Sequence, residues 1–498
     1  MKLFSKNKYL IGLLLGYFVL SFTNITLLPI FNDEGIYLDW GIRSVEKPGM
    51  LYYSIHDGKT PLTMWLFGIF QNLFSNPLFA GRLVSILFGG ISLWGIFRLS
   101  RRFFDNRTAI ISSILYIFTP IIFFFNRQAL MEAGVGAMGI WFAYFYLRKR
   151  YAFAGIFGGI GLLIKVNSVI TLVVVTLISM YRFVRNKKTS EIKNLGIILA
   201  AYMSTSILVL INPDFWRNLT FNSRYGFTIS ELLHFPIATW IGNATSNTFI
   251  IFVFVTPLIT IFSIIGLINM RKKHPAFVAL VILPIIIETL IVKSPIQRYL
   301  VSYIPLLVIP AGFMLSKLVD KRKFLGVALL FLTLILPIYL VFLQIFSPPS
   351  YFSATKTFPN ITDFYYAEGP FSGYAVNQLI SKVRTLENKK ILVLIAENAG
   401  NPESAINVYL EKDKRIRLGY IQSEYFGPTL PNFDCIVEKS STPMYFVSRS
   451  EYLVGLEKYL TQIDKIQSEK YKEFIGIYKF NSDCSKEKTL IVEPVLAP

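Results

Sequence analysis

The chain has 498 residues, of which 53% are hydrophobic and only 16% charged, and its formal net charge is +20. Soluble domains carry about 25% charged residues, so this composition excludes an ordinary soluble protein and favours one that crosses a membrane repeatedly. The positive charge does not indicate nucleic-acid binding, because Lys and Arg occur in short clusters between apolar stretches, as in cytoplasmic loops of membrane proteins.

Apolar stretches of about 20 residues, long enough to cross a bilayer, recur along the chain. The predicted spans are 9–30, 78–98, 108–125, 129–147, 195–211, 247–270, 276–292, 297–316 and 324–346. Basic clusters separate them at 98–107, 148–150, 182–188, 271–273 and 317–323. If every cluster is cytoplasmic, an even number of crossings must lie between neighbouring clusters. The predicted spans meet this condition everywhere except in one segment.

That segment, residues 152–181, has the length of one span, whereas the basic clusters on both sides require two. The stretch "LLIKVNSVI" places Lys165 and Asn167 in its middle. We therefore predict two short helices, 152–164 and 167–181, that meet at an exoplasmic turn. One continuous tilted helix is the alternative, and it would invert the orientation of all later segments.

The predicted class is an α-helical polytopic membrane protein with about eleven transmembrane helices and a cytoplasmic N-terminus. The transmembrane domain covers residues 1–346, and its first exoplasmic loop covers 31–77. Within this loop, the apolar segment 62–74 is too short to cross and is predicted to lie on the membrane surface as an amphipathic helix. A second large exoplasmic loop covers 212–246.

The chain changes character after the last span. A linker rich in Pro, Ser and aromatic residues occupies 347–360, and a small exoplasmic soluble α/β domain is predicted for 361–498. Strands are predicted in "KKILVLIAE", "MYFVS" and "EFIGIYKF", and helices in "PESAINVYLEK" and at 451–469. Cys435 and Cys484 could form one disulfide or remain free thiols, and their spacing does not indicate a metal site.

Ionisable side chains gather at the predicted exoplasmic ends of the spans, where they indicate function because such groups are costly at a membrane. They are Asp33, Glu34 and Lys59 in the first loop, Arg82 and Arg298 near the starts of two spans, and Glu132 and Lys165 at two turns. A carboxylate can take a proton from an attacking hydroxyl or amine, and Lys or Arg can neutralise a departing phosphate. The combination favours group transfer from a lipid-linked phosphosugar.

The adjacent carboxylates cannot both face one point, since neighbouring side chains diverge on a helix or strand. One of the two is predicted to face the reacting centre, and the other to orient the loop or a cation. Arg82 either contacts the phosphate or extends its charge to the membrane surface over an apolar stem, and the second interpretation is favoured.

Glu132 and two further residues of the first loop, His56 and Asp57, can also be interpreted in two ways. Glu132 either joins the site or forms a salt bridge to Arg127 or Lys165. His56 and Asp57 either hold a divalent cation or close a turn, and the turn is favoured. The sequence assigns no metal ligands and no cofactor, and it leaves the need for a divalent metal open.

The segments "NDEGIY", "HDGKTPLTMWLFGIF" and "FAGRLVSILFGGISLWGIFRLSRRFF" resemble the polyprenyl-phosphate-dependent glycosyltransferases of the GT-C fold. The chain is similar to protein O-mannosyltransferases and to the bacterial lipid A aminoarabinose transferase within that class, and the resemblance covers residues 9–320. It implies that Asp33 is the catalytic base. It also implies that Lys59, in "GKTPL", lies near the donor phosphate, with Thr60 in place of the usual proline.

Three later segments carry the resemblance further. "RQALMEAGVGAMGIWFAYF" resembles a turn that normally carries an aspartate, here replaced by Glu132. "LIKVNS" resembles the family's lysine-containing elbow and points to Lys165, and "QRYLVSYIPLLVIPAGF" resembles the late span that opens with Arg298 and Tyr299. The tail resembles the variable C-terminal domains of such enzymes in position only.

The resemblance implies an inverting glycosyltransferase that moves a sugar from a polyprenyl-phosphate donor to an acceptor lipid, glycan or protein, at the exoplasmic face of a bacterial plasma membrane. Candidate catalytic residues are Asp33, Glu34 and Glu132, and candidate donor-phosphate ligands are Lys59, Lys165, Arg298 and Arg82. The alternative is a transporter or flippase of a lipid-linked sugar, which would need binding groups near the bilayer midplane. A non-catalytic scaffold of the same fold is a third interpretation.

Overall fold

The computed structural model describes residues 2–219, 224–356, 366–367, 369, 371–397, 400–422, 443–450, 460–467 and 474–480. It divides into two compact units, which are described separately. The helical unit comprises Met1–Ile25, Arg43–Ser75 and Phe79–Thr357, and the mixed unit comprises Thr26–Ile42, Asn76–Leu78 and Phe358–Pro498. Cys435 and Cys484 lie outside the described residues.

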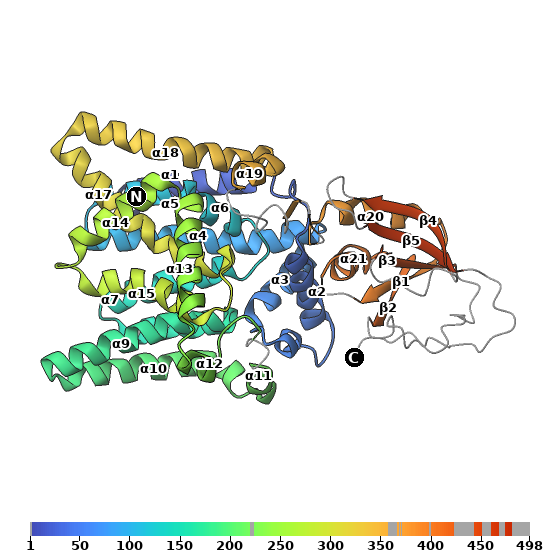
Figure 1. Ribbon diagram of the computed structural model, residues 1–498, viewed down its shortest axis with the longest axis horizontal. Helices are drawn as coiled ribbons and strands as arrows, with labels where there is room; N and C mark the ends of the chain where they lie inside the picture. The colour runs from blue at the N-terminus through green and yellow to red at the C-terminus, as the bar shows by residue number, and fades with distance from the viewer. Residues whose placement is uncertain are drawn as a thin grey trace. The chain divides into compact units, whose positions relative to one another are not determined.

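Apolar helices build the helical unit (Figure 1). Its first half contains α1 Lys2–Phe22, η1 Tyr53–Asp57, α3 Leu62–Leu73, α4 Pro77–Phe103, α5 Asn106–Phe118, α6 Pro120–Asn126, α7 Glu132–Leu147, α8 Tyr151–Ile164, η2 Val166–Ser168, α9 Val169–Asn186 and α10 Thr189–Leu210. Its second half contains α11 Pro213–Asn218, α12 Ile229–Leu233, α13 Ile237–Phe254, α14 Pro257–Met270, α15 Pro275–Ile291, α16 Gln297–Leu300, η4 Ile304–Leu307, α17 Val308–Lys321, α18 Lys323–Phe346 and α19 Pro348–Ala354.

Five helical segments in the described residues are long and apolar enough to cross a membrane: α4, η2 with α9, α10, α13 and α18. The pair α5 and α6, which is bent by 66°, makes a sixth if it is taken as one span. Apolar helices that are shorter include α8, α14 and α15. The described residues are therefore mostly helical, and the predicted class of helical membrane protein is confirmed.

Besides 108–125, which is bent between α5 and α6, two more predicted spans are wrong in detail. The segment 247–270 is not one helix, because α13 ends at Phe254 and α14 begins at Pro257. Thr256 has a φ of 80°, and the proline that follows it cannot continue the hydrogen-bond ladder of α13. The segment 297–316 is likewise divided into α16, η4 and the first part of α17.

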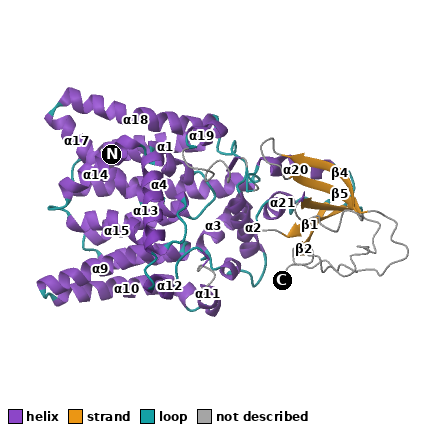
Figure 2. Cartoon of the chain, in the orientation of Figure 1, coloured by secondary structure: helices purple, strands orange, loops and turns teal. Residues whose placement is uncertain are grey.

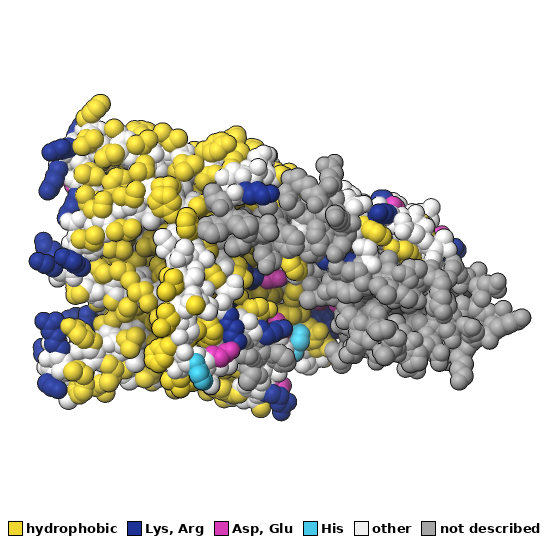
Figure 3. Space-filling view, viewed as in Figure 1, with side chains coloured by type: hydrophobic (Ala, Val, Ile, Leu, Met, Phe, Trp, Pro, Cys, Tyr) yellow, Lys and Arg dark blue, Asp and Glu magenta, His cyan; other side chains and the backbone are white. Residues whose placement is uncertain are grey.

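The basic clusters fall at turns between consecutive helices, and contacts bring several of these turns together. The ring of Phe104, between α4 and α5, lies 5.1 Å from the ring of His274, between α14 and α15. Arg107 in α5 forms an ion pair with Asp320 in α17. Figure 3 shows Lys and Arg side chains along this end of the helical unit, on the left of the view. Three clusters thus share one end, as the even-crossing argument requires.

The break predicted at Lys165 is confirmed. Helix α8 ends at Ile164, Lys165 is extended with a φ of −159°, and α9 begins at Val169 after the single turn of η2. The hydroxyl of Tyr303 donates a hydrogen bond to the carbonyl of Asn167 at 2.9 Å. Tyr303, in the segment between α16 and η4, therefore holds the turn that carries Lys165 in place.

Close packing of α8 on α10 fixes the approach to this break. Gly155 and Gly159, four residues apart on one face of α8, lie against the backbone of α10. A Cβ atom at Gly155 would lie 2.3 Å from the carbonyl oxygen of Ile198, and one at Gly159 would lie 2.6 Å from that of Tyr202. Small residues with this spacing allow helices in membranes to approach closely.

Gly155→Ala is expected to lower the free energy of unfolding by about 1–3 kcal/mol, because one methyl group must separate two backbones. Gly196→Ala is the matched control, since Gly196 in α10 has no heavy atom within 4 Å of its Cβ position. Thermal unfolding of both variants in the same detergent checks the difference. Equal melting temperatures would contradict the assignment of Gly155 to a packing contact.

The mixed unit contains a five-stranded sheet of order β2-β1-β3-β5-β4 (Figure 2). Its elements are α20 Tyr374–Thr385, β1 Ile391–Glu397, α21 Glu403–Leu410, β2 Ile416–Gln422, β3 Met444–Arg449, β4 Leu460–Gln467 and β5 Phe474–Phe480. β1 is parallel to β2 and β3, whereas β5 is antiparallel to β3 and β4. The strands predicted in this region are confirmed as β1, β3 and β5.

The helix predicted at 451–469 is wrong for residues 460–467, which form β4. β4 lies at the edge of the sheet and is paired with β5. Most of its polar side chains are exposed while Leu460 and Ile466 are buried, and this mostly polar sequence hid the alternation typical of a strand. Residues 451–459 lie outside the described part of the chain.

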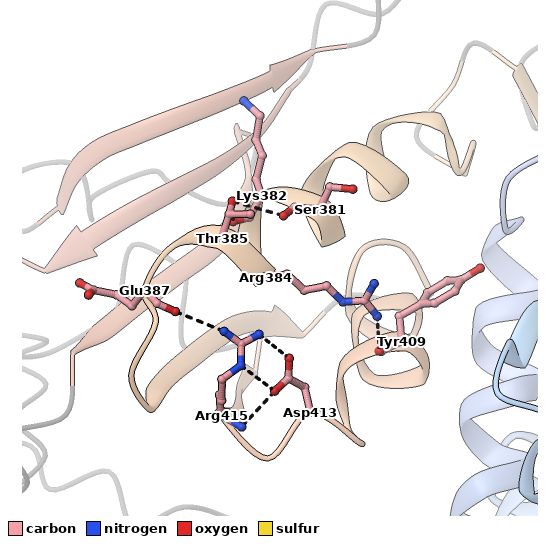
Figure 4. A network of polar contacts seen from close by, with 8 residues as sticks. All are labelled: Ser381, Lys382, Arg384, Thr385, Glu387, Tyr409, Asp413 and Arg415. Carbon is pink, nitrogen blue, oxygen red and sulfur yellow. Dashed lines mark hydrogen bonds and ion pairs between the residues drawn. The ribbon is translucent and has the colours of Figure 1, made fainter.

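Polar contacts join the ends of α20 and α21 to the start of β2 (Figure 4). The guanidinium of Arg415 contacts both carboxylate oxygens of Asp413, at 2.8 and 3.2 Å, and donates to the carbonyl of Glu387. Arg384 donates to the carbonyl of Tyr409 at 3.1 Å. The bonds from Arg415 lower the pKa of Asp413. These contacts connect α20 and α21 beside the parallel strands.

The first part of the chain contributes a helix to the mixed unit. This helix is α2, Asn32–Glu46, and residues up to Ile42 belong to that unit. The side-chain oxygen of Asn32 accepts a hydrogen bond from the backbone of Asn401 at 2.8 Å, and Asn407 donates to Asp39. Sequence analysis did not predict this association, which joins residues more than 360 positions apart.

The fit around the start of α2 is close. Gly400 has a φ of 103°, and a Cβ atom there would lie 2.1 Å from the side-chain oxygen of Asn32. A Cβ atom at Gly373 would lie 2.1 Å from the carbonyl oxygen of Ile30. The rings of Phe31 and Tyr366 are 4.3 Å apart. Residues of the C-terminal region therefore surround the segment that carries Asp33 and Glu34.

Candidate functional site

Three of the predicted site residues meet in the helical unit, although they are far apart in the sequence. Glu132 is the first residue of α7, Lys165 lies at the break after α8, and Arg298 lies in α16. Oε1 of Glu132 accepts hydrogen bonds from Nζ of Lys165 at 2.7 Å and from Nε of Arg298 at 3.1 Å. The Glu132 side chain is fully buried, and the two cations are each 14% exposed. Burial strengthens these interactions.

Lys59, from the loop between η1 and α3, adds a third cation. Its ammonium lies 3.5 Å from the carboxylate of Asp57 and 5.2 Å from the centre of the Tyr225 ring. Burial lowers the pKa of Lys59, the carboxylate of Asp57 opposes this shift, and the positive charges of Lys165 and Arg298 add to it. Lys59 is therefore electrostatically coupled to the other two cations, and we call Lys59, Lys165 and Arg298 the cationic cluster.

Two carboxylates that contact the cationic cluster are each shared between two cations. Glu132 serves two cations, and Asp57 is shared between Lys59 and Arg224, whose guanidinium lies 2.6 Å from it. Lysine carries three hydrogen-bond donors and arginine five, so one carboxylate oxygen cannot use those of both Lys165 and Arg298. Partly buried Lys and Arg side chains gathered in this way are suited to an anion such as phosphate.

Asp33 and Glu34 lie in the first turn of α2, in the mixed unit. Glu34 is fully buried, and its Oε2 accepts a hydrogen bond from the backbone N–H of Phe31 at 2.9 Å. This bond is the part of a capping box in which the third residue of a helix reaches back to the N-cap. Asp33 is partly exposed, and Nδ2 of Asn32 lies 3.4 Å from its Oδ1. The two neighbouring carboxylates thus differ in environment.

The structure contradicts the favoured interpretation of Arg82 as a side chain that reaches the membrane surface. Arg82 is 1% exposed and lies inside the helical unit. It donates hydrogen bonds to the carbonyl of Ile25 at 2.6 Å and to Oε1 of Gln128 at 3.4 Å. A guanidinium that is buried inside the protein must find such acceptors, which connect α4 to the segment after α1.

Arg127 is not the partner of Glu132. Its guanidinium donates to the carbonyls of Ser21 at 3.1 Å and Thr23 at 2.6 Å. His56 lies in the short turn η1 and contacts the carbonyl of Tyr53, as expected for a residue that closes a turn. Within the described residues, there is no group of three or more His, Cys, Asp or Glu side chains that could hold a metal ion.

Sequence analysis missed one buried acid near this site. Glu288, in the last turn of α15, is 3% exposed, and its charge interacts with that of Lys165. An acidic residue in the apolar sequence "PIIIETLI" was the available signal, because charged residues inside spans are rare. Glu288 lies within the predicted span 276–292, whereas the ionisable residues predicted to be functional lie at the ends of spans.

Comparisons with known proteins identify the fold. Residues 58–215 match the family model described as dolichyl-phosphate-mannose-protein mannosyltransferase. ArnT from Cupriavidus metallidurans superposes with a TM-score of 0.60 and 15% identity over 95% of this chain and 98% of that one. Its complex with undecaprenyl phosphate superposes with the same TM-score and 12% identity over 97% and 100%.

The chain has the GT-C fold.

Two further likenesses support the GT-C fold. The archaeal oligosaccharyltransferase AglB from Archaeoglobus fulgidus, in complex with an inhibitory peptide and a dolichol-phosphate, superposes with a TM-score of 0.56 and 13% identity over 92% of this chain and 71% of that one. Undecaprenyl phosphate-alpha-4-amino-4-deoxy-L-arabinose arabinosyl transferase 1 of Pseudomonas fluorescens (strain Pf0-1) is 26% identical over 195 residues. That match covers 36% of this chain and 32% of the relative.

Proposed function

We propose that this protein is a membrane glycosyltransferase that moves a sugar from a polyprenyl-phosphate donor to an acceptor lipid, glycan or protein. The observation that carries the proposal is the cationic cluster, which is suited to a lipid phosphate. The undecaprenyl phosphate in the ArnT complex and the dolichol-phosphate in the AglB complex support the same donor class. The similar proteins named above are transferases, so no finding favours the transporter alternative.

In this proposal the chain has about eleven transmembrane helices, a cytoplasmic N-terminus and an exoplasmic C-terminal domain, in a bacterial plasma membrane. The basic clusters at one end of the helical unit support this orientation, because such clusters face the cytoplasm. The cationic cluster then lies at the exoplasmic side, because α8 separates Lys165 from the cytoplasmic basic cluster at 148–150. A donor phosphate at headgroup depth would reach it from the outer leaflet.

The reaction in this proposal is a single displacement. Asp33 accepts the proton of an acceptor hydroxyl or amine while the acceptor atom attacks the anomeric carbon of the sugar. The bond from that carbon to the phosphate oxygen breaks as the new bond forms, and the electron pair leaves with the lipid phosphate. Lys59, Lys165 and Arg298 stabilise the negative charge that develops on the departing phosphate. Glu132 holds two of these cations in position.

Reconstituted protein should convert radiolabelled undecaprenyl-phosphate sugar into a labelled acceptor product. The assay uses proteoliposomes that contain a bacterial envelope extract as acceptor and a panel of mannose, arabinose and aminoarabinose donors. Release of undecaprenyl phosphate together with labelled product supports the transferase. Movement of labelled lipid between leaflets without any product, over the whole panel, would instead identify a flippase.

The affinity for undecaprenyl phosphate should fall at alkaline pH. Phosphate binding needs the ammonium form of Lys59, and burial lowers its pKa from the usual 10.5. Affinity is therefore greatest below the lowered pKa and is lost as pH rises through it. Lys59→Arg should shift this loss to higher pH, because arginine stays charged. Lys59→Met should bind about 10- to 100-fold more weakly at neutral pH.

Lys293→Arg is the matched control for this pH dependence. Lys293 pairs with Glu231 at 2.8 Å and is no part of the cationic cluster. Titration of each variant with undecaprenyl phosphate between pH 7 and 11 gives the comparison. Identical alkaline profiles for Lys59→Arg and the wild-type protein would remove Lys59 from the phosphate site.

A further inference from the structure

Buried polar atoms without a partner gather around Lys165. Within the described residues, Glu132 and Glu288 are the two carboxylates with a buried oxygen that accepts no hydrogen bond, in each case Oε2. Among the residues that the structure describes, Asn167 is also the one amide whose side-chain nitrogen and oxygen are both buried and accept or donate no hydrogen bond. Such atoms are rare because each costs about 1–3 kcal/mol. Their concentration at one place needs a physical reason.

These atoms belong to one neighbourhood in the helical unit, because α15, which carries Glu288, packs against α7, against α9 and against η4. Lys165 is hydrogen-bonded to Glu132 and interacts electrostatically with Glu288, and Asn167 is two residues along the chain. The hydroxyl of Tyr303, which also interacts with the charge of Glu288, holds the carbonyl of Asn167 at 2.9 Å. The backbone of this turn is therefore fixed while the side-chain amide of Asn167 lacks a partner.

Helix α15 is held so that Glu288 keeps its position. The amide of Asn243 in α13 donates to the carbonyls of Thr289 at 3.1 Å and Val292 at 2.7 Å. The amide of Asn247 donates to the hydroxyl of Thr289 at 2.9 Å. These bonds satisfy the residues next to Glu288 and leave its own Oε2 unpaired.

We propose that Glu288 and Asn167 form a sugar-binding subsite beside the cationic cluster. Glu288 would accept a hydrogen bond from a hydroxyl group of the sugar on the lipid phosphate, and the Asn167 amide would pair with a neighbouring hydroxyl. An amide both donates and accepts, as does a hydroxyl, so this pair of side chains is suited to adjacent sugar hydroxyls. This inference rests on the proposed function, because Lys59, Lys165 and Arg298 would hold the phosphate of the same molecule.

A ligand-binding role and a structural role for Glu288 predict opposite effects of its replacement on the melting temperature. Leucine at this position would remove an unpaired buried carboxylate, so Glu288→Leu should leave the melting temperature unchanged or raise it. If Glu288 instead stabilised Lys165 as an ion pair, the same substitution would lower the melting temperature. Stability therefore separates a ligand-binding carboxylate from a structural one before any ligand is added.

The test compares the affinities of two kinds of lipid, bare undecaprenyl phosphate and undecaprenyl phosphate that carries mannose, arabinose or aminoarabinose. The wild-type protein is expected to bind at least one glycosylated lipid more tightly than the bare lipid. Glu288→Leu and Asn167→Leu should each lower the affinity for that glycosylated lipid about 10- to 100-fold, as expected for a lost hydrogen bond to a charged or buried group. Their affinity for bare undecaprenyl phosphate should stay unchanged.

Glu231→Gln is the matched control, because Glu231 is 42% exposed and pairs with Lys293. It should bind every lipid as the wild-type protein does. Equal affinity of the wild-type protein for all glycosylated lipids and the bare lipid would overturn the subsite. So would variants at Glu288 and Asn167 that affect both kinds of lipid equally. Failure of the wild-type protein to bind even bare undecaprenyl phosphate would instead overturn the proposed function.

Discussion

Asp33→Asn is expected to lower the turnover number by about 10²- to 10⁴-fold, the range that a general base contributes. The amide has nearly the same size as the carboxylate but cannot accept the proton of the acceptor. Asp33 is partly exposed in the first turn of α2, so the loss of its charge should leave folding and donor binding largely intact. Turnover and the affinity for undecaprenyl phosphate are measured on the same purified sample.

The neighbouring Glu34→Gln variant is the control for this substitution. Glu34 is fully buried and caps the start of α2 through the N–H of Phe31, and glutamine keeps a side-chain oxygen that can accept this bond, so the variant should fold. Its turnover should fall much less than that of Asp33→Asn. Near-normal turnover of Asp33→Asn, or a larger loss in Glu34→Gln, would show that Asp33 is not the base.

Glu132→Ala is expected to be the most destabilising single substitution in the cationic site. It removes the fully buried carboxylate that accepts hydrogen bonds from both Lys165 and Arg298, and it leaves those cations to repel each other. The loss of one partner from a buried ion pair typically costs about 3–5 kcal/mol. Denaturation of the detergent-solubilised protein measures this change.

A triple variant separates stability from function at the same place. Glu132→Leu, Lys165→Met and Arg298→Met together replace the ion triad by apolar side chains of similar size, which is often neutral or stabilising. This variant should regain most of the stability that Glu132→Ala loses. It should bind undecaprenyl phosphate at least about 100-fold more weakly, because two charge-assisted phosphate contacts are absent. Retention of wild-type affinity would leave the triad with a structural role only.

Local rules predicted the features that depend on polarity and position along the chain. The break at Lys165 followed from the count of basic clusters, because that count depends only on which side of the membrane each loop occupies. The same reasoning placed Glu132 and Arg298 at turns, and the structure brings both side chains to Lys165. Of the two partners that the sequence offered for Glu132, the structure confirms Lys165 and rejects Arg127, and it adds Arg298, which depends on helix packing.

Local rules could not predict the features that depend on contacts between distant segments. The association of α2 with the C-terminal region rests on shape around Gly400 and on single bonds such as Asn32 to Asn401. Neither leaves a pattern in a single sequence. β4 was mistaken for a helix because an edge strand with many exposed polar residues shows little of the alternation that identifies strands.

The position of α2 has a consequence for how this chain can be divided. The family model covers residues 58–215 and so contains neither Asp33 nor the tail, yet these two omitted parts fold together in the mixed unit. A truncated form that ends after α18 would deprive residues 26–42 of their packing partners. Any chimera that exchanges the tail between relatives must therefore exchange residues 26–42 together with it.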